Sequence, residues 1–167
     1  MKISAHEEYG LRCLLEIGKR ELGESLTIPE IGAAEQLSIP YVAKLLRTLR
    51  RAGFVKSARG KSGGYTLSRP ASQIAISDVM GALGGESVFS SDFCKRHPGQ
   101  GSSCVHSTDC SLRSLWYTIH SAVNGVLSKI TLQDLLRNER DMGIWITGSR
   151  AVRTSSVKQI MATPTSN

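Results

Sequence analysis

Residues 38–70, SIPYVAKLLRTLRRAGFVKSARGKSGGYTLSRP, decide the fold, because an amphipathic segment runs directly into a glycine-rich, basic turn. Ser38 is a favourable helix N-cap, Pro40 suits the first turn and Gly53 suits a C-terminal stop, so we expect a helix between them. Its apolar residues follow the i, i+3, i+4, i+7 spacing of a buried face: Val42, Leu45, Leu46 and Leu49. The opposite face is cationic. One face is therefore expected to pack and the other to meet a charged partner.

The segment after this helix has the pattern of a β-hairpin. Phe54-Val55 and Tyr65-Thr66-Leu67 are short runs of strand-forming residues. Residues 59–64, RGKSGG, join them and combine glycine with positive charge, which suits a tight hairpin tip. We therefore expect a basic hairpin immediately after the basic helix.

Two further helices are expected upstream. Thr27 and Glu30 make a T-x-x-E capping box with Pro29 in the first turn, and this helix should end near Gln36. Its expected buried residues are Ile31, Ala34 and Leu37. Two helices, then the basic helix, then the hairpin are the element order of a winged helix-turn-helix, which is the fold that we expect.

The first helix should run from Ser4 to about Arg20 and end near Gly18 or Gly23. Its apolar stripe consists of Tyr9, Leu11, Leu14, Leu15 and Ile17. Cys13 falls within this stripe, so its thiol is expected to be a small core side chain rather than a reactive group.

Downstream, a short helix is expected from about Ser77 to Leu83, followed by a Gly/Ser-rich stretch and a long amphipathic helix. The long apolar stripe comprises Leu112, Leu115, Trp116, Ile119, Val123, Val126, Leu127 and Ile130. This stripe is five turns long, which is more than so small a head needs for its own core. We therefore expect a partner subunit to pack against it. Thr131 with Asp134 should cap a last short helix through Leu136.

The expected fold is mainly α with a small β-hairpin wing (α+β), a winged head plus a long dimerisation helix. The expected divisions are residues 1–75 for the DNA-binding head, 76–111 for a linker helix and cysteine loop, 112–137 for the dimerisation helix and the short helix after it, and 138–167 for a mobile tail. The sequence assigns no role to Trp145 in that tail.

Charge and composition narrow the function. The 167 residues carry a net charge of +7, and eight cations lie between Lys44 and Arg69 without one acid. Such a patch favours a polyanion such as double-stranded DNA over a membrane or a small-molecule substrate. No apolar run approaches the roughly 18 residues that span a bilayer, and no signal-peptide pattern is present, so we expect a cytoplasmic protein. Because no nucleotide motif or nucleophile–base pairing is evident, we expect no enzymatic activity.

In a helix-turn-helix the second helix of the pair enters the major groove, where Arg and Lys read guanine and hydroxyl groups bond phosphates. The expected DNA contacts are Ser38, Tyr41, Lys44, Arg47, Thr48 and Arg51 from the helix, and Arg59, Lys61, Ser62 and Gly63 from the wing. The alternative for such a helix is a solvated cationic face that binds nothing. The basic hairpin at the spacing of a wing favours DNA binding.

Three of the four cysteines are spaced Cys94-x9-Cys104-x5-Cys110 in a stretch with few side chains that could build a core. Thiols in a reducing compartment are more often metal ligands or redox sensors than structural disulfides. No C-x2-C pair typical of closed zinc sites is present, whereas iron–sulfur clusters accept scattered cysteines. An iron–sulfur cluster, a zinc site and metal-free thiol sensing remain as alternatives, in which the cluster is favoured.

Three groups of residues carry a resemblance to a known family: the wing of residues 58–67, the helix from Tyr41 to Gly53, and the three cysteines followed by Leu112–Trp116 and Ile130–Leu132. Over about residues 1–138 the chain resembles the IscR/NsrR/RsrR family of bacterial regulators. The resemblance implies a homodimeric winged-helix repressor or activator that binds an imperfect palindrome. It also implies that a [2Fe-2S] or [4Fe-4S] cluster tunes DNA affinity, although the family includes members without clusters.

The resemblance also bears on the remaining cluster ligand. IscR-like members have a histidine three residues after the last cysteine, where this chain has Arg113. NsrR- and RsrR-like members have an acid in the first helix, and the matching residue is Glu8. RsrR-like members add a histidine one turn later, where Arg12 stands. The local alternatives to Glu8 are His106, Asp109 and His97, and Glu8 could instead be an ordinary exposed carboxylate.

These observations predict a dimeric transcriptional regulator switched by an iron–sulfur cluster that senses redox state, iron or nitric oxide. The closest rival is a transcriptional regulator that senses redox state through metal-free cysteine thiols. A rival from another class is an iron–sulfur redox protein, but the sequence contains no second cluster motif.

Overall fold

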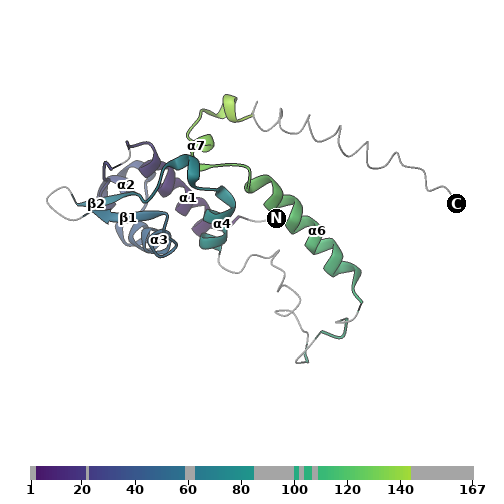
Figure 1. Cartoon of the computed structure of the whole chain (residues 1–167). Helices are drawn as coiled ribbons and strands as arrows, with labels where there is room; N and C mark the ends of the chain where they lie inside the picture. The colour runs from purple at the N-terminus through teal and green to yellow at the C-terminus, as the bar shows by residue number, and fades with distance from the viewer. Residues whose placement is uncertain are drawn as a thin grey trace.

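The computed structural model describes residues 3–21, 23–58, 63–84, 100–101, 104–106 and 109–143. Along the chain the elements are α1 (Ala5–Gly18), α2 (Ile28–Glu35), α3 (Ile39–Arg51), β1 (Val55–Ala58), β2 (Gly64–Leu67), the 3-10 helix η1 (Ala71–Gln73), α4 (Ile76–Gly84), α6 (Ser111–Leu127) and α7 (Leu132–Leu135). Three helices, a two-stranded hairpin and α4 form a head, and α6 projects from it (Figure 1). The predicted mainly helical fold with a β-hairpin wing is confirmed.

Capping explains where the helices begin. Thr27 and Thr131 form the two expected capping boxes, and in each the hydroxyl accepts from the backbone N–H of the acid three residues later, at 3.3 Å. A third box joins Ser4 and Glu7 at the start of α1. Ser38 occupies the N-cap of α3, but its side chain makes no capping hydrogen bond. Sequence-local hydrogen bonds therefore set the starts of α1, α2 and α7.

The core of the head lies between α1, α3, α4 and the base of the hairpin. Cys13, Leu14 and Ile17 from α1 meet the buried face of α3 and residues of α4. Ala34, predicted to be buried, is exposed. The buried edge of α2 instead holds Ile31 and Gly32, and burying these two residues turns Ala34 outward.

The wing is tied to the head through its second strand. β1 and β2 pair antiparallel with Val55 opposite Leu67, and Tyr65 exchanges two backbone hydrogen bonds with Leu26 at 2.8 and 2.9 Å. A Cβ on Gly64 would lie 2.5 Å from the Leu26 carbonyl oxygen. A glycine is thus required where the wing meets the segment before α2.

The long helix differs from the prediction at its end. α6 stops at Leu127, and Ile130 is a core residue of the head, 6 % exposed, not part of the α6 stripe. The chain leaves the helix where it pairs with residues 74–76 at the start of α4: the N–H of Ile76 donates to the Ile130 carbonyl at 2.9 Å, and the N–H of Leu132 donates to the Ile74 carbonyl at 2.8 Å. These two bonds anchor the end of α6 to the head.

The described chain continues beyond the last predicted helix. Residues 139–143 are helical, and the side chain of Asn138 accepts from the N–H of Asp141 at 3.0 Å. Trp145 lies outside the described residues. Within the described part of the chain, no helix has the length and apolarity needed to cross a membrane.

Candidate functional site: a basic helix, a wing and a cysteine segment

The basic face of α3 is held outward by its apolar face. Val42, Leu45, Leu46 and Leu49 are all 0 % exposed in the core. Four cations on the rest of the helix are exposed: Lys44, Arg47, Arg50 and Arg51. None of these four forms an ion pair with another described residue. The predicted opposition of apolar and cationic faces is confirmed, and it leaves the charges directed at solvent.

Two side chains of the expected DNA-contact set also have partners within the head. Tyr41 is half-buried, and its ring lies edge-on to His6 and Tyr9 of α1, with centroids 6.5 and 6.1 Å apart. The Thr48 hydroxyl donates to the Lys44 carbonyl at 3.4 Å. Ser38 is exposed at the start of the helix. Tyr41 therefore links the N-terminal half of α1 to the basic helix.

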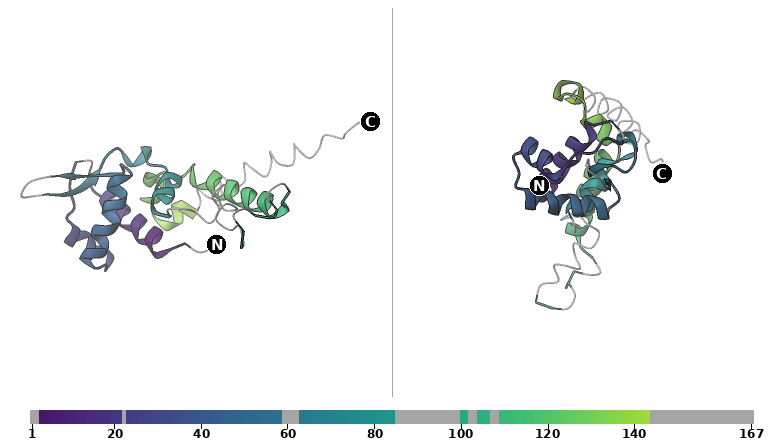
Figure 2. Two further views of the ribbon diagram at one scale, coloured as in Figure 1. Left: turned by 90° about the horizontal axis from the view of Figure 1, so that it is seen from below. Right: turned by 90° about the vertical axis from the view of Figure 1, so that its left-hand side faces the viewer.

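The wing extends from the head at the end opposite α6 (Figure 2). Lys56 on β1 is exposed, and Gly63 precedes β2. Arg59, Lys61 and Ser62, the expected contacts of the hairpin tip, lie outside the described residues. Arg50 and Lys56 are exposed cations that were not among the expected DNA contacts. The position of Arg50, three residues after Arg47 on the same helix, is the sequence signal that could have identified it.

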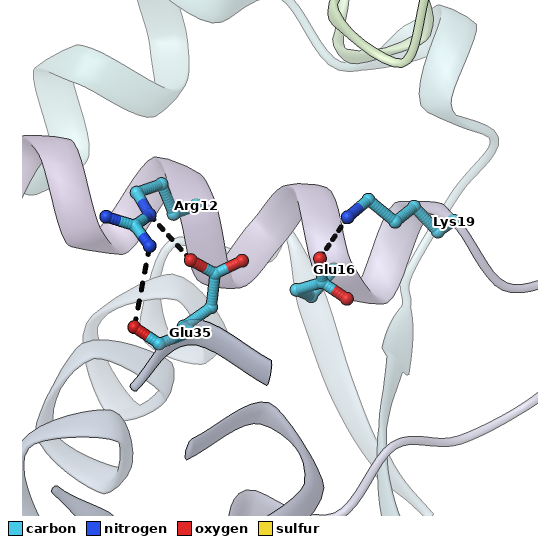
Figure 3. A network of polar contacts seen from close by, with 4 residues as sticks. All are labelled: Arg12, Glu16, Lys19 and Glu35. Atoms are coloured by element: carbon cyan, nitrogen blue, oxygen red, sulfur yellow. Dashed lines mark hydrogen bonds and ion pairs between the residues drawn. The ribbon is translucent and has the colours of Figure 1, made fainter. Parts of the chain in front are cut away.

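An ion pair joins α1 to α2 (Figure 3). The Arg12 Nε donates to Glu35 Oε2 at 2.5 Å, and its Nη2 reaches the Glu35 carbonyl at 3.4 Å. The Arg12 guanidinium also lies 5.5 Å from the centre of the Tyr9 ring. A second pair, Glu16 with Lys19, lies one turn further along α1. The sequence offers no pattern for the Arg12–Glu35 pair, because its partners are 23 residues apart.

The cysteines fall into two environments. Cys13 is 0 % exposed in the core, and burial raises the pKa of its thiol to about 12, so it stays protonated at neutral pH. Cys104 and Cys110 are half-buried free thiols, and Cys110 is the residue before α6. The core position predicted for Cys13 is confirmed, and its thiol is unsuited to metal binding.

The other candidate ligands are spread over the chain. Glu8 is exposed on α1, and His106 and Asp109 are exposed near the two described loop thiols. Cys94 and His97 lie outside the described residues. Among the residues that the structure describes, no three His, Cys, Asp or Glu side chains gather closely enough to hold a metal ion. The donor chemistry of Cys104 and Cys110 suits a cluster, whereas one chain alone does not bring Glu8 to them.

Arg113 occupies the position where a ligating histidine was considered. Its guanidinium Nη2 donates to the carbonyl of His106 at 3.0 Å. An arginine cannot ligate a metal, so this residue acts instead as a tie between the cysteine segment and the first turn of α6.

The apolar stripe of α6 is only partly covered in a single chain, where Leu127 at its end packs against the core of the head. None of the residues of α6, all of which are described, is buried. Leu112 is 59 % exposed, and Leu115 and Val126 are each 48 % exposed. Trp116, Ile119 and Val123 are half-buried. An exposed stripe of this length on a helix is typical of a surface that a partner covers.

Residues 3–138 match the family described as "Rrf2: Iron-dependent Transcriptional regulator". The chain belongs to the Rrf2 family. It is 32 % identical to Protein rrf2 of Nitratidesulfovibrio vulgaris, over 83 % of this chain and 89 % of that protein. It is therefore a transcriptional regulator with a winged-helix head, and the curated relatives are regulators rather than enzymes.

Two solved structures resemble the chain in both sequence and fold. The structure titled T. potens IscR is 30 % identical and superposes with a TM-score of 0.63, covering 81 % of this chain and 86 % of that one. CymR, titled the global cysteine regulator of B. subtilis, is 31 % identical with a TM-score of 0.64, covering 81 % of this chain and 96 % of that one. The family prediction is thus confirmed.

Proposed function

We propose that this Rrf2 regulator is a homodimer that binds an imperfect palindrome in double-stranded DNA and that an iron–sulfur cluster switches its DNA affinity. The geometry of α3 is the observation that supports DNA binding. Four fully buried side chains hold this helix in the core, and four cations on its other side have no described ionic partner. Placed in the major groove, such a face can donate to guanine O6 and N7 and to phosphates.

The wing supplies the second set of contacts. Glycines at the tip allow close approach of the backbone, while Arg59 and Lys61 suit the minor groove or its phosphates. Lys44, Arg47 and Tyr41 would contact bases, with Ser38, Thr48, Arg51, Ser62 and Gly63 in support. Because Tyr41 also contacts α1, movement of α1 would be transmitted directly to the DNA-contact helix.

Dimerisation follows from the apolar stripe of α6. Its six expected interface residues are Leu112, Leu115, Trp116, Ile119, Val123 and Val126. A two-fold axis perpendicular to α6 and beside its apolar stripe would pair the helix with its copy in antiparallel orientation. The cysteine segment at the start of one α6 would then lie near the end of the partner's α6, which is anchored to the partner's head. The helix spans about 25 Å at 1.5 Å per residue.

We infer that Glu8 is the remaining ligand, contributed by α1 of the other subunit. Cys94, Cys104 and Cys110 would supply three thiolates. A cluster bound there would respond to oxidation, nitrosylation or iron loss. Glu8 and the thiolates, held together across the subunits, would set the angle between the two heads and so their half-site spacing. A carboxylate is a weaker ligand for iron than a thiolate, which suits release on a signal.

A second function is favoured by the likeness to CymR. Cys104 and Cys110 are free and half-buried, so a metal-free regulator that senses redox state through these thiols uses the same residues. Iron and acid-labile sulfide content after anaerobic purification separates the two: the cluster regulator contains both, and the thiol regulator contains neither.

Arg47→Ala is expected to weaken binding to the preferred DNA duplex by roughly 30-fold or more, because each base contact contributes about 1–3 kcal/mol and a dimer loses one in each half-site. The duplex is one that the wild-type protein selects from a random-sequence library, and affinity is measured by fluorescence anisotropy. Lys129→Ala, which removes one exposed charge after α6, is the matched control and should bind normally. Equal affinities of the two variants would exclude α3 as the reading helix.

A further inference from the structure

The corner between α3 and the wing contains a set of contacts that the proposed DNA interface does not use. α3 ends in a Schellman motif: Gly53 has a φ of +77°, its N–H donates to the Arg50 carbonyl, and the N–H of Phe54 donates to the Leu49 carbonyl, both at 3.0 Å. Two residues after this left-handed glycine, β1 begins. The direction of the wing relative to α3 is therefore decided at Gly53 and Phe54.

The residues that follow β2 return to this corner. The N–H of Ser68 donates to the Phe54 carbonyl at 3.0 Å, and the Ser68 hydroxyl lies within hydrogen-bond distance of the carbonyls of Gly53 and Phe54. Arg69 Nη1 donates to the Gly53 carbonyl at 3.3 Å, and its Nε donates to the Gln73 carbonyl at 3.1 Å. The guanidinium lies 5.3 Å from the centre of the Phe54 ring, which is 3 % exposed.

We propose that Arg69, assisted by Ser68, is a positioning residue that holds the wing at a set angle to α3, so that helix and wing engage DNA as one unit. The inference rests on the proposed DNA interface. Arg69 joins three places at once: the end of α3, the ring at the start of the wing, and η1 behind it. A planar guanidinium with donors on two sides can do this, whereas a lysine ammonium cannot.

Geometry explains why this corner needs a clamp. A two-stranded hairpin is marginally stable by itself, and apart from the Tyr65–Leu26 backbone pair the contacts of Ser68 and Arg69 are what tie the base of this wing to the end of α3. Four residues of strand carry the wing tip about 13 Å from the corner, at 3.3 Å per residue. A pivot of about 10° would therefore move the tip by roughly 2 Å, enough to break hydrogen bonds between the tip and DNA.

The alternative role for Arg69 is a direct contact with a DNA phosphate. The two roles differ in whether the loss of affinity on removing Arg69 depends on the contacts between the wing tip and DNA. Loss of a phosphate contact lowers affinity by the same factor whether or not the tip binds, and it reduces the salt dependence of binding by about one unit of slope. Loss of a clamp matters only while the tip has contacts to lose.

The test is a double-mutant cycle on the selected duplex, in the full-length protein, with affinity measured by anisotropy over a range of salt concentrations. We expect Arg69→Ala to weaken binding by about tenfold with the native wing and by less than twofold in an Arg59→Ala/Lys61→Ala background. Arg69→Lys should be as weak as Arg69→Ala. Equal losses in both backgrounds, with Arg69→Lys restoring affinity, would overturn the clamp in favour of phosphate binding.

Hydrogen exchange supplies a readout that needs no DNA. In Arg69→Ala the paired amides of β1 and β2 should exchange faster than in the wild type, while the amides of α3 keep their protection; unchanged exchange in the hairpin would overturn the proposal. If Arg69→Ala fails to fold by circular dichroism, Ser68→Ala takes its place in both experiments, since its side chain is exposed. A failure of the proposed function can be told apart from a failure of the clamp. If α3 does not read DNA, Arg47→Ala leaves affinity unchanged, whereas faster exchange of the hairpin amides in Arg69→Ala would still support the clamp.

Discussion

Serine in place of Cys104 or Cys110 is expected to abolish the visible absorption and the bound iron of the anaerobically purified protein. Both thiols are free, and no other described residue offers a thiolate at this end of α6. A hydroxyl has far less affinity for iron than a thiolate, so a single replacement should prevent stable cluster assembly. Cys94→Ser is expected to do the same. Iron and sulfide analysis with a visible spectrum is the measurement.

Cys13→Ala is the matched control for these variants. In the wild-type protein the Cys13 thiol is fully buried, and burial raises its pKa to about 12, so alkylating reagents should not modify it at pH 8. Because this thiol is not a ligand in the proposed site, the Cys13→Ala variant should keep its cluster. Glu8→Ala should keep three thiolates yet change the spectrum or shorten the lifetime of the cluster in air. Full iron content in all three loop variants would refute the cluster, and a silent Glu8→Ala beside an altered His106→Ala or Asp109→Ala would place the ligand within one chain.

The double variant Leu115→Glu/Ile119→Glu is expected to dissociate the protein into monomers. Both residues lie on the apolar stripe of α6, and a two-fold interface loses each of them twice. At about 1.5 kcal/mol for each aliphatic side chain, the loss is roughly 6 kcal/mol, or about four orders of magnitude in the dimer dissociation constant. Sedimentation at micromolar concentration measures the mass.

Tyr117→Glu is the control on the same helix, because Tyr117 is 67 % exposed and lies off the stripe. It adds one charge per chain without entering the expected interface, so this variant should remain a dimer. A double variant that stays fully dimeric beside it would show that α6 does not hold the subunits together.

Local patterns in the sequence predicted the parts of this fold that depend on neighbouring residues. The capping boxes at Thr27 and Thr131 and the two faces of α3 follow from residues at most seven positions apart, and all are present in the structure. The wing followed from strand-forming residues on both sides of a glycine-rich turn. Such signals predict an element well because the interactions that stabilise it lie within it.

Features that depend on distant pairing were missed. Ile130 continues the apolar period of α6, but two backbone hydrogen bonds with the segment at residues 74–76 turn it into the head. Ala34 fits a helical stripe, yet α2 packs on α1 and α3 through Ile31 and Gly32 and leaves Ala34 exposed. Arg69 counted only as one more cation, because its partners are backbone carbonyls that carry no sequence signal.

The candidate metal site was predictable only in part for the same reason. Clustered cysteines and their spacing pointed to thiolate chemistry, and Cys13 could be set apart by its place in an apolar stripe. The remaining ligand depends on which surface of a second subunit comes to the loop. Neither local spacing nor a single chain carries that information, so Glu8 stays a prediction.

The central claim, that a cluster bound by the loop cysteines sets DNA affinity, is tested most directly by one comparison. The anaerobically purified protein is titrated with its selected duplex before and after a chelator removes the iron, at one salt concentration and with the dimer intact in both states. A coupling of about 1–3 kcal/mol between the two sites predicts dissociation constants that differ by roughly 5- to 150-fold. Identical affinities of the iron-loaded and iron-free dimers would contradict the account.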